Sequence, residues 1–213
     1  MELTAEEGRV LGCLVEKQLT TPQQYPLTDN SLLAACNQTT SRDPVVQYDV
    51  ATLRLAIRSL RERELLRTVH RPGERSEKHL HLLDRALELS TGPTALLAVL
   101  LLRGPQTAAE LRARTERMHA FASVTEVEEA LQSLADRAEP LVELLAKHPG
   151  QKGARYADLL VGTGAPVPAP APDRAPAVAP LDEVASLRAE NAALREEVAQ
   201  LRAALDQNRG GSV

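Results

Sequence analysis

Residues 49–83 read DVATLRLAIRSLRERELLRTVHRPGERSEKHLHLL, and this stretch decides the fold. Its first part predicts a helix from about Asp49, a suitable N-cap, to Glu64. Apolar residues recur there at the spacing of one buried helix face, at Leu53, Ala56, Ile57 and Leu60. Two short runs at 65–70 and 78–83 flank a Pro-Gly turn and predict a β-hairpin.

Two more helices are expected before this stretch. Thr4, with Glu7 three residues later, has the pattern of a capping box for a helix that runs to about Leu19. Pro22 and Pro26 then exclude a helix. Thr28 or Asp29 opens a second, short helix that carries Leu32, Leu33 and Cys36.

The same order recurs over residues 91–162. Helices are expected at 93–102, 107–114 and 123–138, followed by a second hairpin around Pro149-Gly150. His70-Arg71-Pro72-Gly73 matches Lys147-His148-Pro149-Gly150. An internal repeat of this kind predicts two copies of one small fold.

Three helices closed by a two-stranded hairpin form a winged helix, a relative of the helix-turn-helix. The predicted fold class is therefore mainly α with small β-hairpin wings, an α+β architecture of two tandem winged-helix domains. The expected boundaries are 1–90 for the first domain and 91–162 for the second. A Pro/Ala-rich linker at 163–180 and a coiled-coil helix at 181–207 follow.

The C-terminal helix carries a heptad pattern. Asn191 falls at an a position between valines, with leucines at d, a combination that favours a parallel two-stranded coil. Glutamates at g and arginines at e also favour parallel pairing, with a frayed tail or a heterotypic coil as the alternatives. The residues expected to support homodimerisation are Val184, Leu187, Asn191, Leu194, Val198, Leu201 and Leu205.

Composition narrows the class of protein. The chain has 213 residues, a net charge of −4 and only 2% aromatic residues, so the cores must be aliphatic. Cys13 and Cys36 lie in apolar helical contexts and are expected to be buried thiols. With no N-terminal signal and no long apolar run, the sequence predicts a soluble, cytoplasmic protein with no membrane contact.

Residues 16–45, EKQLTTPQQYPLTDNSLLAACNQTTSRDPV, are unusually rich in prolines, amides and hydroxyls. Together with LLRGPQT at 101–107, Glu110-Leu111-Arg112 and Arg155-Tyr156, this stretch makes residues 1–162 resemble the YceH-type family of uncharacterised bacterial proteins. The resemblance implies tandem winged helices and a bacterial source, and no particular activity. The family-motif residues of this loop are Glu16, Lys17, Thr21, Pro22, Tyr25, Pro26, Asn30, Asn37, Gln38 and Arg42.

The third helix of the first copy differs in charge from its counterpart. Arg54, Arg58 and Arg61 share one exposed face of helix 49–64. The repeat has Glu128, Gln132 and Ala135 at those places. Residues 54–81 hold eight basic and four acidic side chains, a net charge of +4. Arginine suits phosphate oxygens and guanine edges, so the candidates for contact with double-stranded DNA are Arg54, Arg58, Arg61, Arg67, Arg71, Arg75 and Lys78. The alternative is a solvated face with pairs such as Arg58–Glu62.

The sequence gives little support for a metal site or for catalysis. His79 and His81 lie on one face of a predicted wing strand, and we interpret them as part of a polar wing rather than as metal ligands. Glu16, Lys17 and Asp29 are expected to form a salt-bridge network that fixes the loop. No catalytic constellation, metal site or cofactor motif is recognisable. The sequence therefore predicts a non-enzymatic, dimeric, DNA-binding protein with the role of a transcriptional regulator. The alternative is a protein–protein interaction adaptor that binds an unknown protein.

Overall fold

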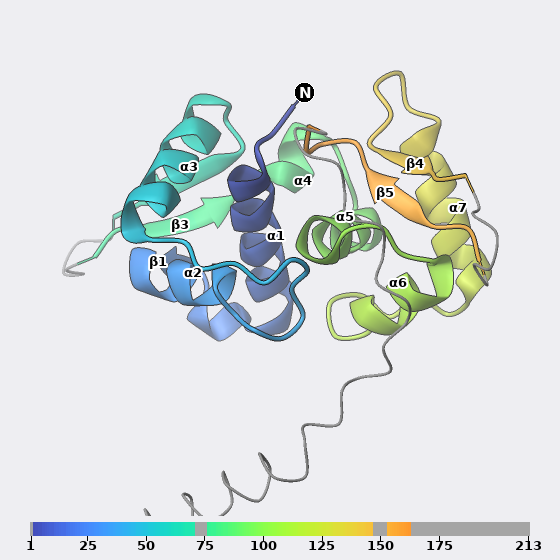
Figure 1. Ribbon diagram of the computed structural model, residues 1–213, viewed down its shortest axis with the longest axis horizontal. Coiled ribbons are helices and arrows are strands. Elements are labelled where there is room, and N and C mark those ends of the chain that lie inside the picture. The colour runs from blue at the N-terminus through green and yellow to red at the C-terminus, as the bar shows by residue number, and fades with distance from the viewer. Residues whose placement is uncertain (1, 71–75, 147–152, 163–213) are drawn as a thin grey trace, which may run out of the picture. The chain divides into compact units, whose positions relative to one another are not determined.

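The computed structural model describes residues 2–70, 76–146 and 153–162. Within these residues the structure is mainly helical, with seven α-helices and two small antiparallel sheets (Figure 1). The α+β class predicted from the sequence is confirmed at this level. The predicted linker and coiled coil, both hairpin turns, and Arg71 and Arg75 lie outside the described residues.

The first half has the predicted order of elements. In chain order they are α1 (Ala5–Thr20), the 3-10 helix η1 (Pro22–Gln24), β1 (Leu27–Thr28), α2 (Asp29–Cys36), α3 (Val50–Glu62), β2 (Leu66–Val69) and β3 (Lys78–His81). Thr4 and Glu7 form the expected capping box at the start of α1. Thr28 caps α2 and Asp49 caps α3, each by accepting a hydrogen bond from a backbone N–H three residues later.

The first sheet has one strand more than the sequence predicts. Its order is β1-β3-β2, and all neighbours are antiparallel. Leu27 on β1 pairs with His79 on β3, and Thr68 on β2 pairs with the same histidine from the other side. β1 thereby ties the proline-rich loop to the hairpin.

The second half repeats the order of helices and hairpin. Its elements are α4 (Leu83–Ala86), α5 (Thr91–Arg103), α6 (Ala108–Thr115), α7 (Val124–Ala135), β4 (Val142–Leu144) and β5 (Tyr156–Asp158). The strand that corresponds to β1 is reduced to a single bridge between Gln106 and Tyr156. The four-residue α4, which the sequence did not predict, leads from the first hairpin to α5.

Corresponding helices bury corresponding residues. The four apolar positions predicted for α3 are all buried. On α7 the buried residues are Val127, Leu131 and Leu134, at the same spacing. Asp49 and Ser123 cap the two helices at equivalent places. The apolar period and the caps therefore specify both helices locally.

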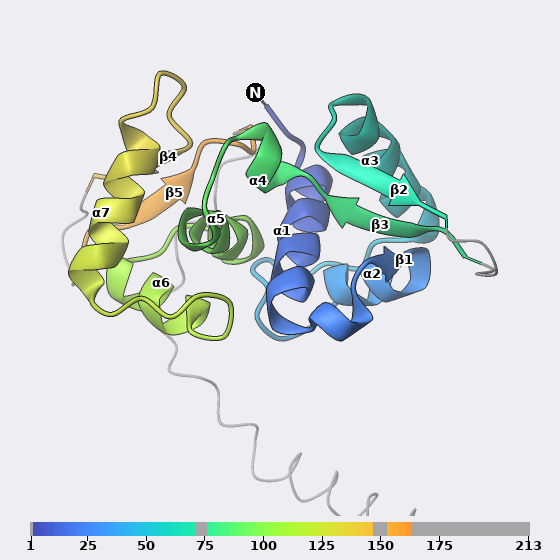
Figure 2. The same ribbon diagram turned by 180° about the vertical axis from the view of Figure 1, so that it is seen from behind.

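The two halves pack through α1 and α5, which lie side by side at the centre of the structure (Figures 1 and 2). A Cβ atom on Gly12 would lie 2.9 Å from Leu102 Cγ and 3.3 Å from the Ala98 carbonyl oxygen, so this approach requires glycine. At the start of the chain, the Leu3 N–H donates to the Leu160 carbonyl at 2.7 Å, and the Gly162 N–H donates to the Leu3 carbonyl at 3.0 Å. All described residues belong to one compact unit, Met1–Gly164, and the domain boundary at residues 90 and 91 stays a prediction.

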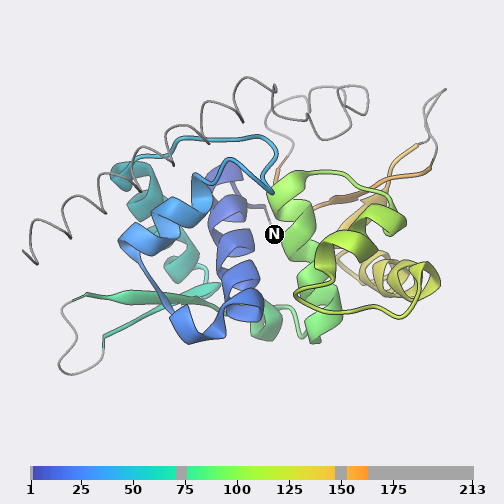
Figure 3. The ribbon, with the colours of Figure 1, turned by 90° about the horizontal axis from the view of Figure 1, so that it is seen from below.

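The segment between α2 and α3, residues 37–49, also bridges the halves. Figure 3 shows it reaching across to the end of α5. There the Asp43 N–H donates to the Leu102 carbonyl at 2.9 Å. Among the described residues, no helix combines the length and the apolar character needed to cross a lipid bilayer.

Candidate nucleic-acid interface

The three arginines predicted on α3 lie together on its exposed side. Arg54, Arg58 and Arg61 all face away from the buried apolar positions of the helix. Leu55, beside them, is 65% exposed, a large value for an apolar side chain. This face of α3 therefore combines cationic and apolar groups.

Arg54 is anchored by an ion pair that the sequence did not predict. Its Nε lies 3.1 Å from Asp29 Oδ2, and His79 Nε2 lies 2.7 Å from Asp29 Oδ1. Partial burial of Asp29 opposes its ionisation, but the hydrogen bonds from His79 and Arg54 outweigh burial and lower the pKa of the carboxyl group. Asp29 thus joins the start of α2 to α3 and β3.

Arg58 and Arg61 differ from Arg54 in this respect. Within the described part of the chain, neither makes a hydrogen bond or an ion pair, and the Arg58–Glu62 pair suggested by the spacing does not form. Arg67 on β2 is exposed as well, while Lys78 on β3 is half-buried and has an interaction partner. The two α3 arginines are the cations most available to an external anion.

The interpretation of His79 and His81 as a polar wing is wrong. Both side chains are buried, each with only 3% exposure, and they point toward the family-motif loop. His79 Nδ1 lies 3.1 Å from Thr68 Oγ1, and His81 Nε2 contacts Gln18 Oε1. The sequence correctly places them on one strand face, but α1 and the start of α2 lie against that face, where Gln18 contacts His81 and Asp29 contacts His79.

The network expected around Glu16 forms, with Arg42 at its centre. Arg42 Nη1 and Nη2 donate to the two Glu16 carboxylate oxygens at 3.1 and 2.7 Å, and Nη2 also donates to Gln38 Oε1 at 2.7 Å. Lys17 Nζ lies 3.4 Å from Gln38 Oε1 and 3.5 Å from Glu16 Oε2. Asp29, which was expected in this network, instead pairs with His79 and Arg54.

The remaining motif residues of the loop mostly make hydrogen bonds with backbone groups and thereby fix the path of the chain. Asn37 and Tyr48 exchange two hydrogen bonds of 2.8 Å, one in each direction between the Asn37 amide and the Tyr48 backbone. The Tyr25 hydroxyl accepts the His81 N–H at 2.8 Å, and burial raises the pKa of this phenol. Thr21 Oγ1 donates to the Lys17 carbonyl at 3.2 Å, and Pro22 begins η1. Pro26 follows a cis peptide bond and Asn30 is exposed.

Arg9 is a structural residue that sequence reasoning missed. It is buried on α1, where Nη1 donates to the Cys36 carbonyl at 3.3 Å and Nη2 to the Pro44 carbonyl at 2.6 Å. An arginine beside Val10 and Leu11 was the only signal in the sequence. Arg9 and Arg42 together hold the start and the middle of segment 37–49.

The two cysteines are buried free thiols, as predicted. The hydrogen bond with the neighbouring Cys13, together with burial, raises the pKa of the Cys36 thiol. Among the described residues, no group of three or more His, Cys, Asp or Glu side chains is arranged to hold a metal ion.

The family-motif residues of the second half are also structural. Gln106 is buried, and its backbone exchanges hydrogen bonds with Tyr156 at 3.0 and 2.8 Å. Thr107 and Glu110 form the capping box of α6. Arg155 Nη1 donates to the Pro105 carbonyl at 3.0 Å and lies 3.2 Å from Glu110 Oε2. These contacts fix the turn between α5 and α6 to β5.

Comparison with known proteins gives a consistent result. A family model described as "Protein of unknown function, DUF480" matches residues 3–151. A UPF0502 protein of Pelobacter propionicus is 44% identical over 218 residues, covering 99% of this chain and 98% of its own length. A UPF0502 protein of Klebsiella pneumoniae is 42% identical, covering 96% and 95%, and one of Shewanella putrefaciens is 40% identical, covering 97% of each chain.

These alignments extend beyond residues 1–162, to which the sequence resemblance was limited. They confirm the expected membership of an uncharacterised bacterial family. The chain belongs to the DUF480 family.

Proposed function

We propose that this chain is a non-enzymatic, dimeric, cytoplasmic protein that binds double-stranded DNA through α3 and the β2–β3 hairpin, in the manner of a transcriptional regulator. The observation that carries the proposal is the exposed pair Arg58 and Arg61, which has no partner among the described residues. Exposed guanidinium groups without partners are available to phosphate oxygens and guanine edges.

The order of elements supports a winged-helix architecture in each half. Three helices are followed by an antiparallel hairpin in both, and the third helix carries one buried and one exposed face. In winged helices the third helix can enter the major groove while the hairpin contacts the backbone. Leu55 suits the apolar contact that a thymine methyl group offers in that groove.

The second half is less suited to DNA. Glu128 and Gln132 are exposed on α7 at the places of Arg54 and Arg58 on α3, and Glu129 is exposed beside them. Phosphates would be repelled from this helix, so we assign DNA contact to the first half alone.

Salt-titrated fluorescence anisotropy with sheared, labelled bacterial duplex DNA tests the proposal. We expect log K to fall linearly with log salt, and Arg58→Gln to weaken binding and lower the slope by about 0.9, the contribution of one phosphate contact. Gln132→Ala, at the equivalent position of α7, is the matched control and should leave both quantities unchanged. Binding that Arg58→Gln and Arg61→Gln leave intact would exclude α3 as the interface.

A protein–protein adaptor is the second candidate, and three exposed apolar residues favour it. Val45, Val50 and Leu55, in and just before α3, are 52%, 40% and 65% exposed. Contiguous exposed apolar residues mark interaction surfaces, and these three lie within eleven residues of one another in the sequence. If no duplex binding is detected at low salt while Leu55→Ser abolishes capture of a defined protein from the source cell, the adaptor function is favoured.

A further inference from the structure

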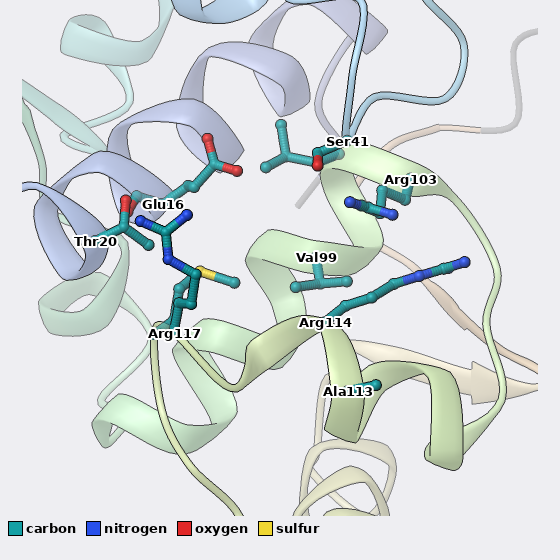
Figure 4. A pocket seen from close by; sticks show the side chains of 10 residues that line it. Glu16, Thr20, Ser41, Val99, Arg103, Ala113, Arg114 and Arg117 are labelled. Carbon is teal, nitrogen blue, oxygen red and sulfur yellow. The ribbon is translucent and has the colours of Figure 1, made fainter. Parts of the chain in front are cut away.

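A cavity of about 270 Å³ lies where the two halves meet, away from the exposed face of α3. Its walls come from α1, segment 37–49, α5, and α6 with the residues after it (Figure 4). The polar and charged side chains around it are those of Glu16, Thr20, Ser41, Arg103, Arg114 and Arg117. It is therefore bordered by both stretches of family-motif residues, 16–45 and 101–107.

The cavity carries an excess of positive charge. Three guanidinium groups line it against one carboxylate, and that carboxylate, Glu16, is already bound by Arg42. Arg114 contacts Gln106 Oε1 and lies 3.8 Å from Glu110 Oε1. Within the described part of the chain, Arg103 and Arg117 make no hydrogen bond or ion pair. Figure 4 shows these two arginines approaching the cavity from different elements.

Arg103 is held there at a cost in free energy. Its side chain is half-buried, and burial followed by the nearby positive charge of Arg114 lowers its pKa. A partly desolvated cation beside a like charge is stabilised by an anion that lies close to it. Glu16 and Asp43 act on Arg103 electrostatically, but neither outweighs burial and neither forms an ion pair with it, so an external anion would stabilise its charge further.

The backbone at the rim is also strained. Ser41 has a φ of 61°, in the left-handed region that serine rarely adopts, and its carbonyl accepts the Arg42 Nη1 at 2.9 Å. Such conformations cluster at ligand-binding sites. The Ser41 and Thr20 hydroxyls provide hydrogen-bonding groups beside the guanidinium groups.

We propose that this cavity binds a small phosphorylated metabolite, with its phosphate held between Arg103 and Arg117. Planar guanidinium groups match phosphate oxygens in geometry and charge. Val99, Leu102 and Met118 offer an apolar wall for a short carbon skeleton, and the volume suits a molecule of sugar-phosphate size. This inference does not depend on DNA binding by α3.

Isothermal titration calorimetry on the full chain tests the site, with inorganic phosphate and glucose 6-phosphate as probes and with ionic strength held constant by chloride. We expect saturable binding of one phosphate-bearing probe per chain and no binding of glucose. Arg103→Met and Arg117→Met should each weaken binding by roughly tenfold or more, because each removes a charge-assisted hydrogen bond. Arg85→Met, which removes an exposed arginine that does not line the cavity, is the matched control.

Thermal melts of both cavity variants distinguish a lost site from a lost fold. Because Arg103 and Arg117 make no hydrogen bond or ion pair within the described residues, we expect melting temperatures within a few degrees of the parent protein, about the effect of a neutral surface change. Absence of saturable binding for both phosphate probes overturns the proposal. Equal weakening by Arg85→Met overturns it too, as does a loss of duplex DNA binding in the cavity variants, which would assign these arginines to a nucleic-acid surface.

Discussion

Arg42 connects more parts of the structure than any other single side chain in the motif loop. Its side chain is fully buried and its Nε donates to the Ala35 carbonyl at 3.1 Å, while its terminal nitrogens bind Glu16, Gln38 and the Ser41 carbonyl. A buried charge is tolerated only when paired and hydrogen-bonded in this way. The fork of the guanidinium is therefore essential to segment 37–49.

Replacement of Arg42 by lysine should be strongly destabilising. Lysine keeps the charge, but it cannot make the bidentate pair with Glu16 and also donate to Ala35. We expect Arg42→Lys to lower the free energy of unfolding by on the order of 3 kcal/mol in urea denaturation. Lys17→Met, which removes a partly exposed partner of the same Glu16, should cost less than about 1 kcal/mol. Similar losses in both variants would contradict this role of Arg42.

His81 should make stability depend on pH. Burial lowers its pKa, and Asp84, whose Oδ1 lies 3.6 Å from His81 Nδ1, only partly opposes this. The folded protein therefore keeps His81 neutral at pH values where the unfolded chain binds a proton. As the pH falls below about 6.5, the ordinary histidine value, the unfolded state gains that proton and the free energy of unfolding decreases.

Urea denaturation at about pH 7.5 and about pH 5.5 measures this contribution. We expect the parent protein to lose more stability between the two pH values than His81→Gln does. His70→Gln, at an exposed histidine, should lose as much as the parent protein. Asp29 and Asp158, whose pKa values are also shifted, are common to all three proteins and cancel in the comparison. An equal loss in His81→Gln would show that His81 does not titrate in this window.

Sequence patterns correctly predicted the individual residues whose structural roles depend on near neighbours in the chain. Asp49 caps the helix that begins at the next residue, and Leu53 is buried because of its place in the helical period. Arg9 and His81 were not predicted correctly, because their partners are distant in sequence. Arg9 binds carbonyls 27 and 35 residues away, and His81 contacts Gln18 from 63 residues away.

Among the elements, the packing of α1 against α5 holds the two halves of the compact unit together. Both helices are rich in buried residues, and on α1 the close approach occurs at Gly8 and Gly12, one turn apart. Without side chains at these positions, Leu101 and Leu102 lie against the backbone of α1. Small residues of this kind allow two helices to come close enough for dense packing.

Gly12→Leu should separate these helices. A side chain there would meet Leu102 and the Ala98 carbonyl, and backbone cannot move aside as a flexible side chain can. We expect a loss of about 1–3 kcal/mol or more in the free energy of unfolding. Ala109→Leu, at an exposed position of α6, adds the same bulk without a clash and should change stability by less than about 0.5 kcal/mol. A neutral Gly12→Leu would show that the interface can relax.

The elements that sequence predicted least well are the shortest. The long helices have caps and an apolar period, and their predicted bounds agree with the structure to within three residues. β1 has two residues, and it forms only because β3, about 50 residues later, offers a free edge. Neither a period nor a turn signal marks such a strand. The hairpin strands are also shorter than predicted, although the Leu82 N–H still donates to the Leu65 carbonyl beyond their ends.

For the whole molecule, the sequence predicts association through residues 181–207. We expect sedimentation equilibrium to give twice the chain mass for the full protein and the single-chain mass after residues 181–213 are deleted. Leu187→Lys with Leu194→Lys, at two d positions, should give the same result because charges at d oppose the coil. Ala189→Lys, at the outward f position, is the matched control. An unchanged mass after the deletion would exclude this dimer.

The backbone pairing of Leu3 with residues 160 and 162 affects the order in which the unit can be completed during synthesis. While the chain emerges from the ribosome, α1 forms early, but its Gly8–Gly12 side has nothing to cover it until α5 follows. Leu3 finds its hydrogen-bond partners later still. A nascent chain halted near residue 90 should therefore remain open to protease within α1, whereas one released after residue 162 should resist it. The first half, which contains α3, would then reach its final form only after the second half has been translated.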